Sequence, residues 1–167
     1  VTKLAAEHLC LLYFKSYRVP TVALRYFTVY GPRQRPDMAF HRFGRALLEG
    51  GAIRVFGDGE QTRDFTYVAD IVAANVRAAW VPEAVGGVFN VAGGSRVALR
   101  EVLALLVELS GRQANITYEV SARGDVRDTF GDTTRARQVL GYHPTVALRE
   151  GLAAELAYLR PLYASPE

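Results

Sequence analysis

The chain has 167 residues, of which 50% are hydrophobic and 22% are charged, and this composition is typical of a soluble globular protein. Its formal net charge of +3 is too small, and its arginines too scattered, to indicate a nucleic-acid partner. No run of residues approaches the roughly 18 apolar positions of a membrane span, so the sequence predicts no membrane association.

The first predicted element is a helix that ends near Tyr17. Its opening residues already read as helix interior, with apolar residues at Leu4, Leu9 and Leu12 and no initiator methionine before them. We therefore expect the chain to be part of a longer protein. The single cysteine, Cys10, excludes an intrachain disulfide and favours a reducing compartment, which we expect to be the cytoplasm.

The next predicted element is a strand over residues 22–29. It is rich in β-branched and aromatic residues without strict alternation, which indicates a parallel strand covered on both faces. In open parallel sheets ligands bind beyond the carboxyl ends of the strands, so Thr28, Arg33 and Arg35 are expected to project toward a ligand. Two arginines beside a hydroxyl favour an anionic ligand, and the alternative is a surface turn with solvated arginines.

The remaining pattern alternates strands with helices and so predicts an α/β fold. Aspartates at positions 70 and 132 are predicted to cap two of the helices, whereas Ala98 and Ala147 stand where a capping box would place Ser or Thr. The predicted helices cover residues 38–48, 70–80, a segment containing 102–109, a short segment after 132, and 148–163, and the predicted strands cover 53–56, 64–68, 88–91 and 116–120.

Five segments resemble, in order, the motifs of extended short-chain dehydrogenase/reductases that act as nucleotide-sugar epimerases and dehydratases. They are Thr2-Lys3 at the tail of a Tyr-x-x-x-Lys motif, LRYFTVYGPRQ, FGDGEQTRDFTYVADI, FNVAGG, and GDVRDTFGDTTRARQVLGY with a later LREGL. Any one is weak, but five in the family's order are specific and cover essentially the whole chain.

The resemblance implies an α/β fold that is the C-terminal half of an extended Rossmann-type enzyme. Residues 1–167 would hold its final strands and helices, interleaved with a small substrate-binding subdomain. The Gly-rich phosphate loop of the N-terminal NAD-binding half is not in the sequence, and neither is the catalytic tyrosine, which belongs four residues before Lys3. This part alone is therefore expected to be inactive.

The chemistry that the resemblance implies is NAD-dependent epimerisation at C4 of a UDP-sugar through a 4-keto intermediate. A tyrosine pKa of about 10 is too high for a base at neutral pH, so a nearby ammonium must favour the ionised form. By resemblance Lys3 supplies that charge and also holds the nicotinamide ribose, while Tyr26 and Phe27 lie beside the nicotinamide. The alternatives are a solvated lysine and two core aromatic residues.

The resemblance also implies a set of contacts to the sugar nucleotide. Arg63 matches the arginine that binds the diphosphate, and Arg127 is a second candidate for that role. Val55 and Phe56 resemble the segment that packs near the uracil. The alternatives are that Arg127 pairs with the aspartate two residues before it or the one after it, and that Val55 and Phe56 are both core residues.

The segment from Thr28 to Met38 resembles the uronate 4-epimerase branch of the family. Many hexose epimerases carry Asn where Thr28 stands and a large aromatic residue where Thr129 aligns. We therefore expect UDP-glucuronate as the substrate, with Thr28 and Arg35 binding its C6 carboxylate, unless Arg35 simply pairs with Asp37 on the surface.

Other functions remain open at this stage. Within the family the alternatives are a UDP-glucose 4-epimerase and a dehydratase or decarboxylase. A different class is a non-catalytic sugar-nucleotide-binding fragment. The helix that bears Lys3 resembles a dimer-interface helix, so a homodimer is expected, and the three histidines match no metal-ligand spacing, so no metal is expected.

Overall fold

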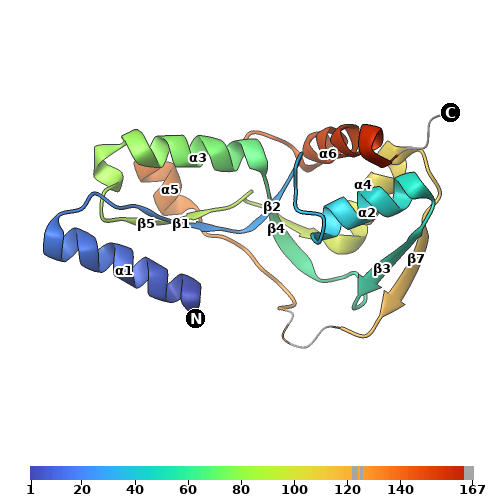
Figure 1. The fold of residues 1–167 in the computed structure, drawn as a ribbon, viewed down its shortest axis with the longest axis horizontal. Helices are drawn as coiled ribbons and strands as arrows, with labels where there is room; N and C mark the ends of the chain where they lie inside the picture. Colours follow the sequence, from blue (N-terminus) through green and yellow to red (C-terminus); the bar gives the residue numbers. More distant parts are fainter. Residues whose placement is uncertain (122–123, 125, 164–167) are drawn as a thin grey trace.

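A computed structural model describes residues 1–121, 124 and 126–163 (Figure 1). The predicted α/β class is confirmed. In chain order the elements are α1 (Thr2–Tyr17), β1 (Ala23–Tyr26), β2 (Thr28–Tyr30), α2 (Ala39–Glu49), β3 (Ala52–Phe56), β4 (Thr62–Tyr67), α3 (Val68–Trp80), the 3-10 turn η1 (Pro82–Ala84), β5 (Val88–Val91), β6 (Arg96–Ala98), α4 (Leu99–Ser110), β7 (Asn115–Glu119), α5 (Thr134–Leu140) and α6 (Leu148–Tyr163).

The described strands form three small sheets. β1 pairs with β5 and β3 pairs with β7, both in parallel, while β4 lies between a parallel β2 and an antiparallel β6. The predicted single strand over residues 22–29 is therefore wrong in one respect. It breaks at Phe27, where the chain leaves β5 and takes β4 as its new partner, and this change of partner leaves no mark on the local hydrophobic pattern.

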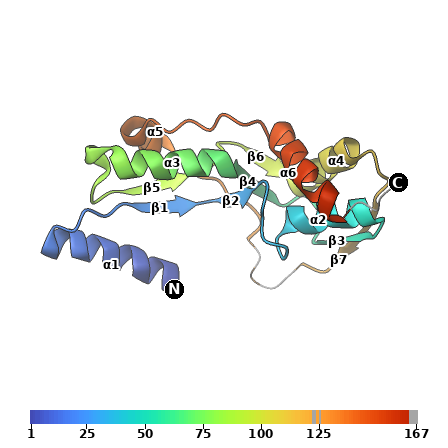
Figure 2. The ribbon, with the colours of Figure 1, turned by 45° about the horizontal axis from the view of Figure 1, so that its top comes forward.

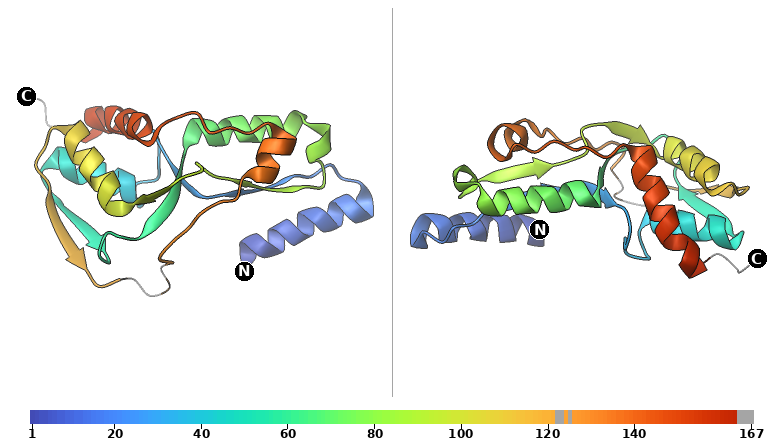
Figure 3. Two further views of the ribbon diagram at one scale, coloured as in Figure 1. Left: turned by 180° about the vertical axis from the view of Figure 1, so that it is seen from behind. Right: turned by 90° about the horizontal axis from the view of Figure 1, so that it is seen from above.

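The molecule has two hydrophobic clusters, and the elements that form them lie toward opposite ends of its long axis (Figure 1). One holds Phe89 and Val91 of β5 with residues of α3 and α5. The other holds Ile53 and Val55 of β3 with residues of α2, α4 and α6, and α6 packs against both of the other helices (Figure 3). Strands β2 and β4 connect the two clusters, so the break at Phe27 lies at their junction.

Asp70 does not cap a helix, contrary to the prediction. Helix α3 begins at Val68, and the carboxylate of Asp70, in its first turn, is only 5% exposed. It accepts hydrogen bonds from the backbone N–H and hydroxyl of Thr145, both at 3.0 Å, and from the N–H of Val146 at 3.4 Å. Asp70 therefore attaches α3 to the segment that leads into α6.

The other predicted helix starts agree more closely with the structure. Ala98 is the N-cap residue of α4 and gives no side-chain capping bond, as expected. Asp132 lies one residue before the N-cap of α5, and its carboxylate accepts the Thr134 N–H at 2.9 Å. The short strand β6 just before α4 was not predicted, because its three residues carry no recognisable alternation.

Helix α1 lies beside β1 and buries none of its residues (Figure 2). The Thr21 hydroxyl donates to the Cys10 carbonyl at 3.0 Å, and Arg25 of β1 pairs with Glu7 at 2.6 Å. Apolar side chains such as Leu4 and Leu9 are more than half exposed. None of the helices in the described part of the chain is both long enough and apolar enough to span a membrane.

Candidate functional site

Two adjoining hollows lie where the chain passes from β1 to β2. One, of about 470 Å³, is lined by Tyr26, Phe27, Thr28, Val29, Met38 and Thr129. The other, of about 280 Å³, is lined by residues that include Thr28, Met38, Phe56 and Arg63. Because Thr28 and Met38 line both hollows, the two adjoin, and together they form the candidate site.

The first hollow collects the residues expected beside a nicotinamide. Tyr26 is 46% exposed, and its hydroxyl donates to Oδ1 of Asn75 on α3 at 2.7 Å. Phe27 lies against Gly131, where an added Cβ would come within 2.8 Å of the Phe27 ring. The strand break thus places two consecutive aromatic side chains at a sheet edge. Tyr26 is held by its hydrogen bond to α3, and Phe27 packs against Gly131.

The second hollow contains the predicted diphosphate ligand, Arg63. Its Nη1 donates to the carbonyls of Thr62 and Arg127, both at 2.9 Å. These bonds anchor one side of the guanidinium to the main chain at the entrance to β4. A planar cation fixed in this way is suited to phosphate oxygens.

The main-chain carbonyl of Arg127 accepts a hydrogen bond from Arg63, but the side chain of Arg127 lines neither hollow. Both of its terminal nitrogens lie 3.4 Å from Oδ2 of Asp58, which is its ion-pair partner among the described residues. Asp128 instead accepts from Thr62, and Asp125 lies outside the described residues. The Glu60 N–H, and then Arg127, lower the pKa of Asp58 below its ordinary value.

The two residues expected near the uracil point in different directions, because successive side chains of β3 alternate between its faces. Phe56 is 40% exposed and lines the second hollow. Val55 is only 1% exposed and packs in the hydrophobic core. A ligand contact at residue 55 would therefore involve its main chain.

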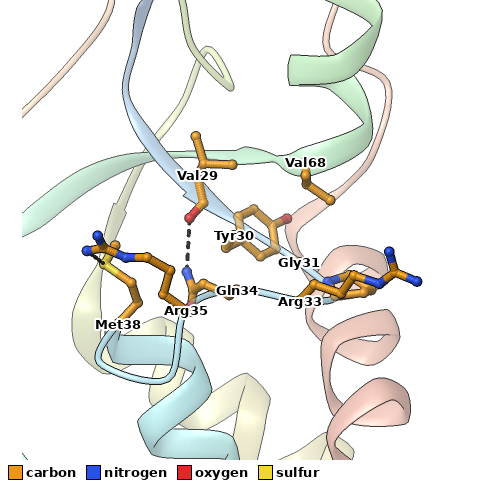
Figure 4. Close-up of a pocket in the computed structure, with 9 residues that line it drawn as sticks. Val29, Tyr30, Gly31, Arg33, Gln34, Arg35, Met38 and Val68 are labelled. Carbon is orange, nitrogen blue, oxygen red and sulfur yellow. Dashed lines mark hydrogen bonds between the residues drawn. The ribbon is translucent and has the colours of Figure 1, made fainter.

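Arg35 lies at a third hollow of about 300 Å³, which the turn between β2 and α2 encloses (Figure 4). Its Nη2 pairs with Asp37 at 3.1 Å and lies 3.7 Å from the sulfur of Met38. This is the surface pairing considered above as the alternative. Arg35 lines neither of the hollows that Thr28 lines, whereas Met38 lines all three.

Lys3 lies in the first turn of α1, where it is exposed, and it lines none of the hollows described here. The structure thus gathers Tyr26, Phe27, Thr28, Phe56 and Arg63 around two adjoining hollows, and Lys3 is not among the lining residues. No group of three or more His, Cys, Asp or Glu side chains within the described residues is arranged to hold a metal ion.

Comparison with known proteins identifies the family. A model of the NAD dependent epimerase/dehydratase family matches residues 1–92, which is more than half of the chain. The chain belongs to this family.

Its relatives include epimerases named for two different sugars. A Bacillus subtilis protein named as an uncharacterized UDP-glucose epimerase is 43% identical over 98% of this chain and 52% of its own length. The UDP-glucuronate 4-epimerase of Thermodesulfobacterium geofontis is 36% identical over 90% of this chain and 46% of its own. The chain thus spans about half the length of these relatives.

A solved structure of the same family is closely similar. It is the UDP-glucuronic acid 4-epimerase of Bacillus cereus in complex with UDP-glucuronic acid and NAD, with 44% identity and a TM-score of 0.92. The match covers 97% of this chain and 52% of that one. The fold of this chain is therefore that of the matching half of the Bacillus cereus epimerase.

One residue that organises this epimerase-family site was not predicted. Asp64 is fully buried next to Arg63, and it accepts the N–H groups of Gly93, Gly94 and Gly131 at 2.6, 3.2 and 3.3 Å. Burial raises the pKa of Asp64, and the three N–H groups oppose that rise. An aspartate at an inward position of a strand was the signal in the sequence, because a buried carboxylate needs several donors.

Gly93 of the FNVAGG motif allows the β5–β6 turn to come within hydrogen-bond distance of Asp64. A Cβ at Gly93 would lie 2.1 Å from the carbonyl oxygen of Phe65, so only glycine allows the β5–β6 turn to approach β4 this closely. Asp64 then joins this turn to the segment that carries Thr129 and Gly131. Within this segment, Thr129 lines the first hollow.

Proposed function

We propose that this chain is the C-terminal part of a longer NAD-dependent enzyme that epimerises a UDP-sugar at C4, with UDP-glucuronate as its substrate. One observation carries the proposal: Thr28 lines a hollow that also contains Arg63 and Phe56 and a second hollow that contains Tyr26 and Phe27. An arginine and an aromatic ring suit a nucleoside diphosphate, and the adjoining aromatic edge suits a flat cofactor ring. The similar Bacillus cereus protein was solved with UDP-glucuronic acid and NAD.

The residues have separate roles in this proposal. Tyr26 and Phe27 form one side of the nicotinamide end of the NAD site, while Arg63 binds the diphosphate and Phe56 packs by the uracil. NAD, when bound, would supply reversible hydride transfer at C4 of the sugar. In the full-length protein Lys3 favours ionisation of a tyrosine that precedes this chain. Arg127 is the second diphosphate ligand, after release from Asp58.

Arg63→Ala should weaken UDP binding by about 1.5 to 3 kcal/mol, because it removes a charge-assisted contact to an anion. Isothermal titration of the full-length protein with UDP measures the loss, which corresponds to roughly ten- to 150-fold in affinity. Arg149→Ala is the matched control, since that arginine pairs with Glu108 on the surface. An Arg63→Ala affinity within about twofold of the wild type would limit Arg63 to a structural role.

The choice of UDP-glucuronate depends on Thr28 and Arg35. Oxidation at C4 leaves the C6 carboxylate β to the new ketone, and such acids lose carbon dioxide when the breaking bond stands perpendicular to the carbonyl plane. A guanidinium and a hydroxyl that hold the carboxylate would prevent that alignment and add affinity. In the structure Arg35 pairs with Asp37, so it must exchange that carboxylate for the substrate's.

The proposed function is tested by assaying Arg35→Ala on two sugars. Activity on UDP-glucuronate should fall at least about tenfold, which is the loss of one charge-assisted bond, while activity on UDP-glucose changes little. A decarboxylated pentose product would support the carboxylate role directly. Asp37→Ala is the control, because it frees Arg35 and leaves the substrate contact intact.

UDP-glucose 4-epimerisation is the second candidate, favoured by the name of the Bacillus subtilis relative. The same assay decides between them. A wild-type preference for UDP-glucose, or equal losses on both sugars in Arg35→Ala, would overturn the uronate proposal. Absence of activity on any UDP-sugar despite UDP binding would instead support a sugar-nucleotide-binding role.

We also propose that the full-length protein is a cytoplasmic homodimer that associates through α1. The exposed side chains of Leu4, Leu9 and Leu12 on this helix support the proposal, because a helix with no buried residue needs a partner surface. The N-terminal part of the same protein would cover the remaining edge of β1. The single cysteine is the support for the cytoplasm.

A further inference from the structure

The turn between β2 and α2 carries arginines on its outer side and a glutamine on its inner side. Figure 4 shows Arg33 and Arg35 directed away from each other, with Gln34 between them and its amide aimed at the end of β2. Arg33 has a φ of +69°, which lies in the left-handed region that is unfavourable for an L-residue. Such a backbone persists only where its surroundings hold it.

The side chain of Gln34 holds the turn from both ends. Its Nε2 donates to the Val29 carbonyl at 2.9 Å, and its Oε1 accepts the backbone N–H of His41 at 3.0 Å. That N–H belongs to the first turn of α2, whose N-cap residue, Met38, gives no side-chain capping bond. The side-chain amide of Gln34 therefore ties the turn to β2 with its donor and caps α2 with its acceptor. A side chain that makes both contacts must carry both a donor and an acceptor.

The side chain of His41, on α2, links the turn to the end of α6. It is 4% exposed, and its Nδ1 lies 3.0 Å from the main-chain oxygen of Gln34. Because a carbonyl only accepts, Nδ1 carries the proton, and in the neutral ring Nε2 accepts from the Tyr163 hydroxyl at 3.1 Å. Tyr163 ends α6 and is itself covered by the guanidinium of Arg45, 5.0 Å from its ring centre.

We infer that Gln34, held by His41 and Tyr163, is a positioning residue for recognition of the sugar. It sets where the turn presents Met38, which lines the same hollows as Thr28, and Arg35, which lines the third hollow. This inference rests on the proposed function. It adds that the C-terminal helix, through Tyr163, takes part in substrate recognition although it does not line the sugar site.

The test compares Gln34→Glu with the wild type in the full-length protein. Glutamate keeps the size and the acceptor, but it loses the donor and sets a carboxylate against the Val29 carbonyl. We expect KM for UDP-glucuronate to rise about tenfold, from the loss of a partly buried hydrogen bond, with UDP affinity unchanged within twofold. UDP affinity reports that the Arg63 side of the site is intact. Gln113→Glu, on an exposed loop, is the control.

A second readout does not depend on catalysis. Hydrogen exchange of the segment from residue 31 to 42 should become faster in Gln34→Glu and, by a smaller factor, in Tyr163→Phe, which removes only the hydroxyl. Tyr163→Phe should also raise KM, by less than Gln34→Glu does. This graded pair keeps the inference testable if the first variant folds poorly.

The outcomes separate this inference from the proposed function. An active wild type whose variants show faster exchange with unchanged KM would overturn the positioning role alone. Unchanged exchange in Gln34→Glu would overturn it as well, because the turn would not depend on this amide. A wild type inactive on every UDP-sugar would overturn the proposed function, and the positioning role with it.

Discussion

In the full-length protein, Lys3→Met should lower kcat at neutral pH by about 10²- to 10⁴-fold, the usual contribution of a general base that has lost its activation. The ammonium of Lys3 favours the tyrosinate form of a neighbouring tyrosine, and methionine keeps the length of the side chain without its charge. The rise of rate with pH should therefore move to higher pH. The protein should also retain less NAD, because the lysine is proposed to hold the nicotinamide ribose.

The sequence offers a matched control for this experiment. Lys3 and Lys15 are the only two lysines, and both lie on α1, in its first and last turns. Lys15→Met removes the same charge from the same helix, so it should leave the pH profile and NAD content unchanged. If Lys3→Met retained full activity with an unshifted profile, its proposed role would be wrong.

Most helices and strands were predictable because their hydrophobic periodicity is local. The break at Phe27 was not, since it comes from a change of strand partner from β5 to β4, and these partners are distant in the sequence: Tyr26 pairs with Val91, whereas Thr28 pairs with Phe65. Asp70 was misassigned for a related reason. Its position before an apolar run suggested a cap, but a distant segment at Thr145 supplies its donors.

The residues of the candidate site were predicted from the resemblance to the epimerase family more than from hydrophobic periodicity. The gathering of Thr28, Phe56 and Arg63 around one hollow agrees with the roles assigned to them, which stay proposals. The sequence did not reveal the residues that hold the main chain around this site in place. Asp64 and Gln34 act through hydrogen bonds to main-chain groups, and such partners have no side-chain signature in the sequence.

Glu155 is a further buried group that periodicity could have identified. It shares the inward face of α6 with Gly151, Leu152 and Leu156, at helical spacing, so its carboxylate enters an apolar interior. Glu155 is 1% exposed, and its Oε2 accepts the Gly31 N–H at 3.2 Å. Burial raises its pKa to about 7, against the opposing effect of that N–H.

Glu155→Gln should therefore stabilise the protein at alkaline pH. Between the ordinary pKa of 4.5 and the folded value of about 7, the folded state binds more protons than the unfolded one, so wild-type stability falls as pH rises through this window. The difference corresponds to about 3 kcal/mol, lost in full above pH 7. Glutamine keeps an acceptor for the Gly31 N–H and does not ionise, so its advantage should grow from acidic to alkaline pH and then level off.

Urea unfolding of the full-length protein at pH 5 and pH 8 measures this effect. The gain of Glu155→Gln over the wild type should be larger at pH 8 by up to about 3 kcal/mol, of the order that the shifted pKa predicts. Glu150→Gln is the control, because that glutamate lies on the same helix but is exposed. Equal gains at both pH values would show that Glu155 is ionised in the folded protein across the whole range. Its carboxylate would then draw enough stabilisation from the Gly31 N–H to outweigh its burial.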